Sequence, residues 1–314
     1  MQSRVIIGYV IMIILIIIMA EFVGLFIKEN IIKPKEMNEW LNKADMHEDW
    51  ARDLRKHEIE VSTNTYYAKY EPYITYRHKP YTSTYLNINE DGLRYTWNDC
   101  AKENATKIFF FGGSAIWGYG SRDNYTIPSI VTKKLCEKGY NIHTTNFGEL
   151  GRVNTDEMID YFIQLRDNKP DIVIFYDGFN DIYSAYNGNV CIPMGSHNRE
   201  FEFNKRGTID IVEYLKTTMI GLTIVKIMTP PKTYHPELID DAVECYKNNI
   251  RIIDTVNKEY NIKGFYLWQP SMSAYTSKIN MEMDGLKQYL YLKMYSLMRY
   301  IQMKEVMKWL QIRL

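Results

Sequence analysis

Three stretches in the middle of the chain carry residue types that fit acyl-transfer chemistry. Ser114 follows Gly113 in FGGSAIWGYG, Gly151 lies in NFGELG, and Asn180 lies in DGFND. A serine hydroxyl becomes a nucleophile when a base activates it, and backbone N–H groups together with an asparagine amide stabilise an oxyanion. These residues predict a site where Ser114 attacks and where its own N–H, a glycine N–H and the Asn180 side chain act as donors.

Each of these residues also has a purely structural interpretation. Ser114 and Asn180 are common helix caps, and the glycines suit tight turns. Two other functional interpretations are excluded: no lysine follows at the P-loop spacing, and Ile116 stands where a G-x-S-x-G elbow needs glycine. The occurrence of all three stretches at the ends of successive apolar runs favours a site over three unrelated caps.

The elements that would position these residues alternate between strand and helix. Short apolar runs, predicted as strands, are KIFFFGG, YNIHTTNFG, PDIVIFYDG and IKGFYLWQP. Helix-length segments at 127–138, 155–168 and 236–260 lie between them or directly before the last run. Continuous apolar strands alternating with helices predict a three-layer α/β/α domain with at least four parallel strands. Ligands bind beyond the carboxyl ends of such strands, which is where the three stretches stand.

The N-terminus is apolar enough for a membrane anchor. Residues 5–20 carry no charge, and residues 22–27 continue the run after Glu21. A helix over 5–27 reaches about 34 Å, enough to cross a hydrocarbon core of about 30 Å. Ile18 and Ala20 make a poor small-x-small cleavage site, so an uncleaved transmembrane helix in 1–27 is expected.

Residues 28–105 form a polar, uneven stretch. Its first part, 36–59, carries apolar residues among many charges and predicts an amphipathic juxtamembrane helix. The tyrosine-rich remainder, with a turn signal at 90–92, predicts short strands or extended structure.

Composition excludes several classes of partner and cofactor. The 38 basic and 38 acidic residues balance, so the charge does not indicate nucleic-acid binding. Four cysteines occur without a C-x-x-C pair and without histidines at ligand spacing, so neither a metal site nor another cofactor is expected. Free or buried thiols are favoured over one or two disulfides, which remain open.

The three stretches resemble the motifs of the SGNH hydrolases, the GDSL-type esterases and lipases. The serine block appears as FGGSAIWGYG, the glycine block as NFGELGRVNT and the asparagine block as YDGFND, while YEPYITYR and DGLRYTW resemble the preamble of membrane-anchored members. The resemblance spans about residues 107–270 and implies a flavodoxin-like SGNH fold, with Ser114 as nucleophile and Gly151 and Asn180 as oxyanion donors. Gly113, Gly178 and Asp181 would be supporting residues; Gly113 replaces the commoner aspartate of this motif.

The family's base, a histidine in a D-x-x-H motif near the C-terminus, is not found. No histidine of this sequence has an aspartate three residues before it, and none follows His235. His197 and His235 are the alternatives, but all six histidines are interpreted as surface residues. The domain at 106–314 is therefore expected to be C-terminally incomplete, and its activity is expected to be low.

Together these patterns predict a single-pass membrane protein with three parts: an anchor at 1–27, a connecting segment at 28–105 and the SGNH-like domain at 106–314. The domain would lie outside the cytoplasm and act on a small-molecule or carbohydrate ester, in the second case acyl groups of envelope polysaccharide. The alternative is a catalytically inactive relative that binds a glycan or a partner, or the product of a truncated gene.

Overall fold

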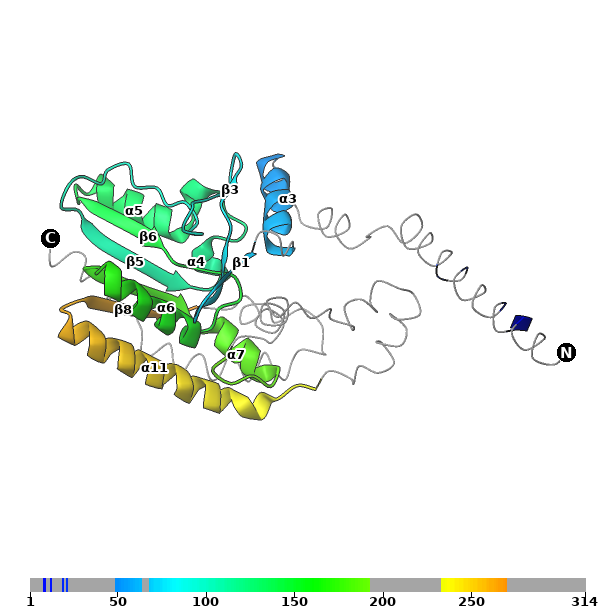
Figure 1. Cartoon of the computed structure of the whole chain (residues 1–314). Helices are drawn as coiled ribbons and strands as arrows, with labels where there is room; N and C mark the ends of the chain where they lie inside the picture. The colour runs from blue at the N-terminus through cyan, green and yellow to red at the C-terminus, as the bar shows by residue number, and fades with distance from the viewer. Residues whose placement is uncertain are drawn as a thin grey trace, which may run out of the picture. The chain divides into compact units, whose positions relative to one another are not determined.

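The computed structural model describes residues 49–63, 68–192 and 233–269, together with residues 8, 9, 12, 19 and 21 (Figure 1). The three long ranges belong to one compact unit and the five single residues to another. Most of the predicted anchor, the first part of the juxtamembrane helix and residues 270–314 therefore lie outside the described residues. In the described part of the chain, no helix combines the length and apolar character needed to cross a membrane.

A four-stranded parallel sheet forms the centre of the long unit. Its strands are β5 (Thr106–Gly112), β6 (Ile142–Asn146), β7 (Ile172–Asp177) and β8 (Lys263–Trp268). They lie in the order β6-β5-β7-β8, and every neighbouring pair is parallel. All four predicted strands are confirmed. The prediction succeeds because the apolar side chains are buried on both faces, as parallel sheets require.

Helices cover both faces of the sheet, which makes three layers (Figure 1). They are α5 (Ile127–Glu137), α6 (Asn154–Asp167) and α11 (Ile239–Glu259), the last preceded by the 3₁₀ helix η3 (Pro236–Leu238). Along β5, Ile108 and Phe110 pack in one core with Leu135 of α5. The intervening Phe109 and Phe111 pack on the opposite face with side chains of α6 and α11. The three-layer prediction is confirmed.

The strand order creates a switch point beside β5. From β5 the chain goes to β6 on one side, and then returns across β5 to form β7 on the other side. At such a point the connections leave in opposite directions and open a crevice at the carboxyl ends of the strands. Ser114 follows β5 and Asn180 follows β7, so both emerge at this crevice.

The segment before the sheet contains one helix and two hairpins. They are α3 (Asp49–Thr63), β1 (Ala68–Glu71) with β2 (Thr75–His78), and β3 (Tyr81–Thr82) with β4 (Asn87–Ile88), each strand pair being antiparallel. The short strands predicted here are confirmed, and α3 continues a few residues beyond the predicted end of the juxtamembrane helix. Leu54 and Val61 of α3 share a buried core with Trp117, so the segment packs on the sheet domain.

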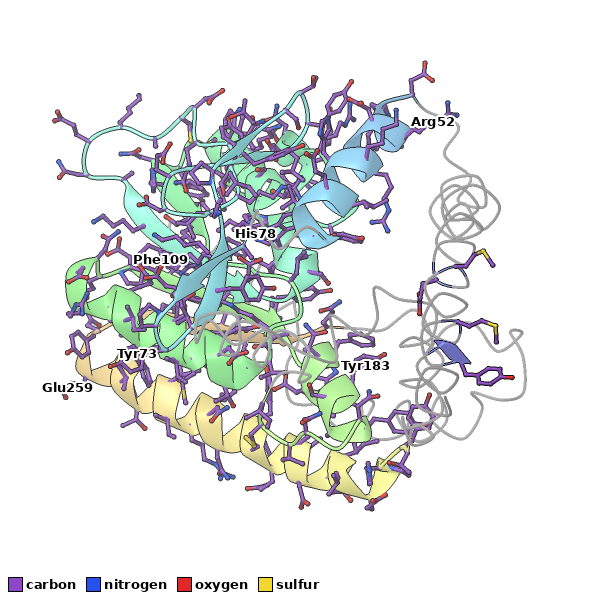
Figure 2. The ribbon with its side chains drawn as sticks, turned by 45° about the vertical axis from the view of Figure 1, so that its right-hand side comes forward. Arg52, Tyr73, His78, Phe109, Tyr183 and Glu259 are labelled. Atoms are coloured by element: carbon purple, nitrogen blue, oxygen red, sulfur yellow. A yellow bond between two sulfur atoms is a disulfide. The ribbon has the colours of Figure 1, made fainter. Side chains whose placement is uncertain are left out.

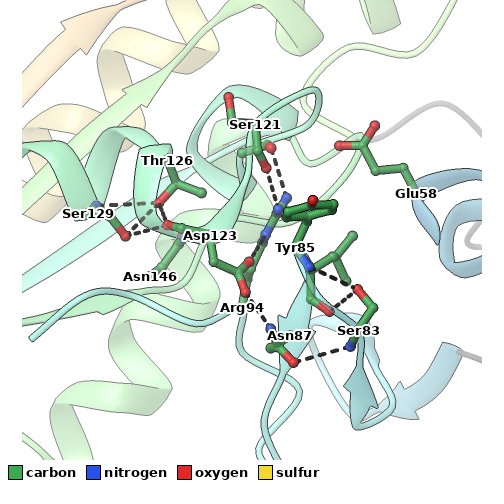
Figure 3. Close-up of polar contacts among 12 residues, drawn as sticks. Glu58, Ser83, Tyr85, Asn87, Arg94, Ser121, Asp123, Thr126, Ser129 and Asn146 are labelled. Atoms are coloured by element: carbon green, nitrogen blue, oxygen red, sulfur yellow. Dashed lines mark hydrogen bonds and ion pairs between the residues drawn. The ribbon is translucent and has the colours of Figure 1, made fainter. Parts of the chain in front are cut away.

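A buried arginine fixes the turn after the serine-bearing helix (Figure 3). The Arg94 guanidinium contacts Asp123 of the 3₁₀ helix η2 (Asp123–Tyr125) at 3.0 Å and donates to the carbonyls of Gly118 and Ser121 at 2.8 and 2.5 Å. Its guanidinium also lies 4.5 Å from the centre of the Trp117 ring. Arg94, in the stretch DGLRYTW, therefore stabilises the turn that follows Ser114, although it lies twenty positions before that serine in the sequence.

The four cysteines form two disulfides, and the preference for free thiols was wrong. Cys100 pairs with Cys136 of α5, and Cys191 pairs with Cys245 of α11. The paired residues are 36 and 54 positions apart in the sequence. Only the fold brings them within reach of each other, and connectivity of this kind is not encoded in local spacing.

Candidate active site

Ser114 is the first residue of the short helix α4 (Ser114–Trp117), directly beyond β5. The residue at the N-cap position is Gly113, and no side chain caps this helix. The interpretation of Ser114 as a cap is therefore wrong. The Ser114 side chain is half-buried, and its hydroxyl makes no hydrogen bond within the described residues. A serine placed in this way keeps its hydroxyl available for chemistry.

Asn180 approaches the serine turn from β7. It is the second residue of α7 (Phe179–Tyr186), whose N-cap is Gly178 and which has no side-chain cap. A Cβ placed on Gly113 would lie 2.5 Å from Asn180 Nδ2. The asparagine amide therefore occupies the space that a side chain at position 113 would need, and a larger residue there would have to displace the end of the Asn180 side chain.

Gly178 is the second glycine with a clear steric role. Its φ is +95°, and an added Cβ would lie 2.5 Å from the Trp268 ring of β8. The left-handed backbone and the tryptophan together require glycine at this position. The turn directs α7, and with it Asn180, back toward the end of β5.

Gly151 is bonded along the chain to Arg152, whose carbonyl contacts Asn180. Asn180 Nδ2 donates to the Arg152 carbonyl at 2.7 Å, and that carbonyl also lies 3.7 Å from the Cβ position of Gly113. Gly151 is exposed, with φ +71°, and its N–H has no partner among the described residues. The ends of β5, β6 and β7 thus bring Gly113, Arg152 and Asn180 into one group.

Asp181 and Asp177 anchor the turn that carries Asn180 to the neighbouring helices. It is 3% exposed, and its carboxylate accepts the backbone N–H of Asn154, the first residue of α6, at 3.1 Å. Asp177 accepts the Asn154 side chain and the Tyr246 hydroxyl, both at 2.7 Å. These bonds join the end of β7 to α6 and α11 directly beneath the asparagine turn.

A third carboxyl group, Glu157 of α6, is fully buried in the same cluster. Burial, followed by the charge of Asp177, raises the pKa of Glu157 well above its usual range. Burial also raises the pKa of the neighbouring Asp177. Burial raises the pKa of Asp181 as well. The described residues hold no group of three or more His, Cys, Asp or Glu that could hold a metal ion.

The prediction of surface histidines fails at His78. This residue is 2% exposed, its Nδ1 lies 2.7 Å from Glu149 Oε1, and its ring is 5.4 Å from that of Trp117. His143 is exposed on β6, as expected, and the partly exposed His57 and His235 contact neighbouring side chains. None of these four makes a hydrogen bond to Ser114; His47 and His197 lie outside the described residues.

Sequence reasoning missed the buried charges around the glycine block. Arg152 donates to Asp160 at 2.5 Å and to the Tyr76 carbonyl at 3.0 Å, and Arg77 also binds Asp160 at 2.7 Å. The only signal was the presence of an arginine in each of two motif stretches. Their partners are 8 to 83 residues away, so no local pattern marks the cluster.

No family profile and no curated protein matches this chain. Among solved structures, the SGNH-family esterase AlinE4 is similar at 16% identity with a TM-score of 0.31, over 64% of this chain and all of AlinE4. The psychrotrophic esterase EstA from Pseudoalteromonas sp. is similar at 14% identity and a TM-score of 0.30, over 66% and 99% of the two chains. A single-site variant of the acetyl xylan esterase Axe2 from Geobacillus stearothermophilus is similar at 17% identity and a TM-score of 0.25, over 51% and 75%. Likenesses at this level do not assign the chain to a family.

Proposed function

We propose that the protein is a serine ester hydrolase or acyl transferase of the SGNH type. One observation carries the proposal: Gly113, Asn180 and the Arg152 carbonyl lie in mutual contact at the switch point of the sheet, with Ser114 and Gly151 as their chain neighbours. The contact supports the prediction that Ser114, Gly151 and Asn180 form one site, and neither Ser114 nor Asn180 is used as a helix cap.

The proposed reaction begins when the Ser114 Oγ attacks the ester carbonyl carbon. A C–O bond forms, the carbonyl π electrons move to oxygen, and the Gly151 N–H and the Asn180 amide stabilise the resulting oxyanion. Collapse of this intermediate breaks the bond to the leaving alcohol, which takes up a proton, and transfer of the acyl group to water or another alcohol completes the cycle. The proton on Oγ needs a base, and none of the described histidines contacts Ser114.

The substrate we propose is an acylated carbohydrate. Phe179 and Tyr183 flank Asn180 on α7, are 36% and 42% exposed, and their rings are parallel with centroids 6.1 Å apart. Exposed aromatic faces beside the site suit the apolar face of a sugar ring. The two disulfides support placement in an oxidising compartment. With an anchor at 1–27, such a domain would meet envelope polysaccharide from outside the cytoplasm.

Rescue by imidazole tests the proposed chemistry. The full chain and Ser114→Ala are assayed on a short acyl ester with increasing imidazole, and the rate of the alanine variant is subtracted. We expect a slow Ser114-dependent rate that rises with imidazole, because free imidazole replaces the missing base. Fast Ser114-dependent hydrolysis without imidazole would contradict the missing base and would point to His197 or His235. No Ser114-dependent turnover at any imidazole concentration would favour the alternative, an inactive binding protein.

A further inference from the structure

The residue after Gly151 occupies an unusual position. Arg152 is 3% exposed, and three groups accept hydrogen bonds from its guanidinium: Asp160 of α6 at 2.5 Å and the carbonyls of Tyr76 and Ile74 at 3.0 and 3.4 Å. Tyr76 lies on β2 and Ile74 on the turn before it. The arginine side chain therefore joins the glycine loop to the β1–β2 hairpin and to α6.

Further contacts from β2 hold the rest of the same loop. The Tyr76 hydroxyl donates to the Leu150 carbonyl at 2.5 Å, and His78 pairs with Glu149 at 2.7 Å. Figure 2 shows the hairpin lying against the domain, with Tyr73 at its turn and His78 at the end of β2. Three residues of the loop, at positions 149, 150 and 152, are thus held by β2. The exposed Gly151 lies between the last two.

The backbone of Arg152 contacts the second predicted donor. Its carbonyl accepts a hydrogen bond from Asn180 Nδ2 at 2.7 Å. A primary amide carries two hydrogens, so this bond orients the group and leaves the other N–H for an oxyanion. Arg152 is thus the sequence neighbour of Gly151, and its carbonyl holds the Asn180 side chain.

We propose that Arg152 is a positioning residue that couples the β1–β2 hairpin to both oxyanion donors, Gly151 and Asn180. The inference rests on the proposed function for its catalytic consequence, whereas its geometric part can be tested separately. Arg152 does not touch the reacting atoms. It keeps the two donors at a fixed separation, and misplacement of such groups by about 1 Å can cost about a hundredfold in rate.

The chain offers a matched control for burial and bonding. Arg94 is 2% exposed and, like Arg152, binds one carboxylate and two backbone carbonyls. Its contacts are to Asp123, Gly118 and Ser121, and it contacts neither Gly151 nor Asn180 (Figure 3). Replacement of either arginine by lysine keeps the charge and removes the planar fork, so both variants should lose similar stability.

The experiment compares Arg152→Lys and Arg94→Lys in the full chain. The readouts are the melting temperature and the second-order rate constant for fluorophosphonate labelling of Ser114. We expect similar losses of melting temperature in the two variants. The labelling rate should fall about ten- to a hundredfold in Arg152→Lys, because this variant releases the oxyanion donors. In an Asn180→Ala background Arg152→Lys should cause a smaller fall, because one donor is already absent. Arg94→Lys acts on the turn after α4 and should change the rate by the same factor with and without Asn180. No fall in Arg152→Lys, or a fall of the same size with and without Asn180, would overturn the proposal.

A spectroscopic readout separates this proposal from the proposed function. If wild-type Ser114 does not label, the proposed function fails, and the side-chain amide resonances of Asn180 then decide the positioning claim. They are assigned by their disappearance in Asn180→Asp. We expect these resonances to shift in Arg152→Lys and to stay in place in Arg94→Lys. Resonances that do not move in Arg152→Lys would refute the coupling even in an inactive protein.

Discussion

At the scale of single residues, the site depends on the absence of a side chain at position 113. The Asn180 amide lies where a Cβ on Gly113 would be, so the identity of one residue determines the position of another that is 67 positions away. In this chain the glycine is therefore part of the proposed oxyanion site.

Gly113→Ala should displace Asn180 and remove its bond to the Arg152 carbonyl. We expect fluorophosphonate labelling to fall by about 10²–10³, the cost of losing one oxyanion donor. A double-mutant cycle with Asn180→Ala checks the cause, because two changes that act on the same group are not additive. The double variant should label no more slowly than Asn180→Ala alone; additive losses would show that Gly113 acts by another route.

Glu157→Gln should change how stability depends on pH. The folded-state pKa of Glu157 is raised by burial and by Asp177, so the folded protein retains a proton that the unfolded chain releases above about pH 4.3. The stabilising contribution is complete below that pH and is lost as pH rises toward the folded-state value. Glutamine has nearly the same size and shape as glutamate and does not titrate. The unfolding free energy of the variant should therefore gain on wild type by up to about 1.4 kcal/mol per pH unit above pH 4.3.

Denaturant titrations of both proteins between pH 4 and pH 8 measure this difference. Asp156, whose pKa is raised to about 6 mainly by burial, contributes a similar loss between pH 4 and 6 in both proteins, and it cancels in the comparison. Parallel pH profiles for wild type and variant would show that Glu157 is ionised in the folded state.

At the scale of elements, the strands and helices of the sheet domain could be predicted and the polar clusters could not. β5 to β8 are short apolar runs with glycine or proline nearby, and these signals are local. The contacts of Arg77 and Arg152 form only because β2 packs near α6, although the bonded residues are more than 70 positions apart in the sequence. The burial of His78 has the same origin, since its sequence context TYRHKP shows no apolar run.

The disulfides make a prediction at this scale. Cys100–Cys136 ties the chain before β5 to α5, and Cys191–Cys245 ties the chain after α7 to α11. Alkylation of the unfolded, unreduced protein should modify no thiol, and alkylation after reduction should modify all four cysteines. Reduction should destabilise the fold by about 2–4 kcal/mol per bridge. Cysteines that are modified before reduction would be free thiols, and they would remove the support for an oxidising compartment.

At the scale of the whole molecule, the sequence predicts features that lie outside the described residues. The apolar run at 5–27 predicts an anchor, and the D-x-x-H motif that the resemblance implies is not found in the sequence. The described structure shows the parallel sheet and the switch point beside β5. The absence of a histidine base stays a prediction, because His47 and His197 are not among the described residues.

Membrane extraction tests the anchor. Because about 23 apolar residues suffice to span the hydrocarbon core, the protein should stay with the membrane in high salt and in alkaline carbonate, and detergent should release it. A variant lacking residues 1–27 should be released without detergent and serves as the control. Release of the full chain by carbonate would exclude a spanning segment.

The central claim is that Ser114 lies beside working oxyanion donors, and the most direct test is to map where a fluorophosphonate reacts. The full chain is incubated with the probe, digested and analysed by mass spectrometry, with Ser114→Ala and Asn180→Ala in parallel. The account predicts a slow adduct on Ser114, absent in Ser114→Ala and reduced about 10²–10³-fold in rate in Asn180→Ala. An adduct on another residue, or a Ser114 adduct that forms equally fast without Asn180, would contradict it.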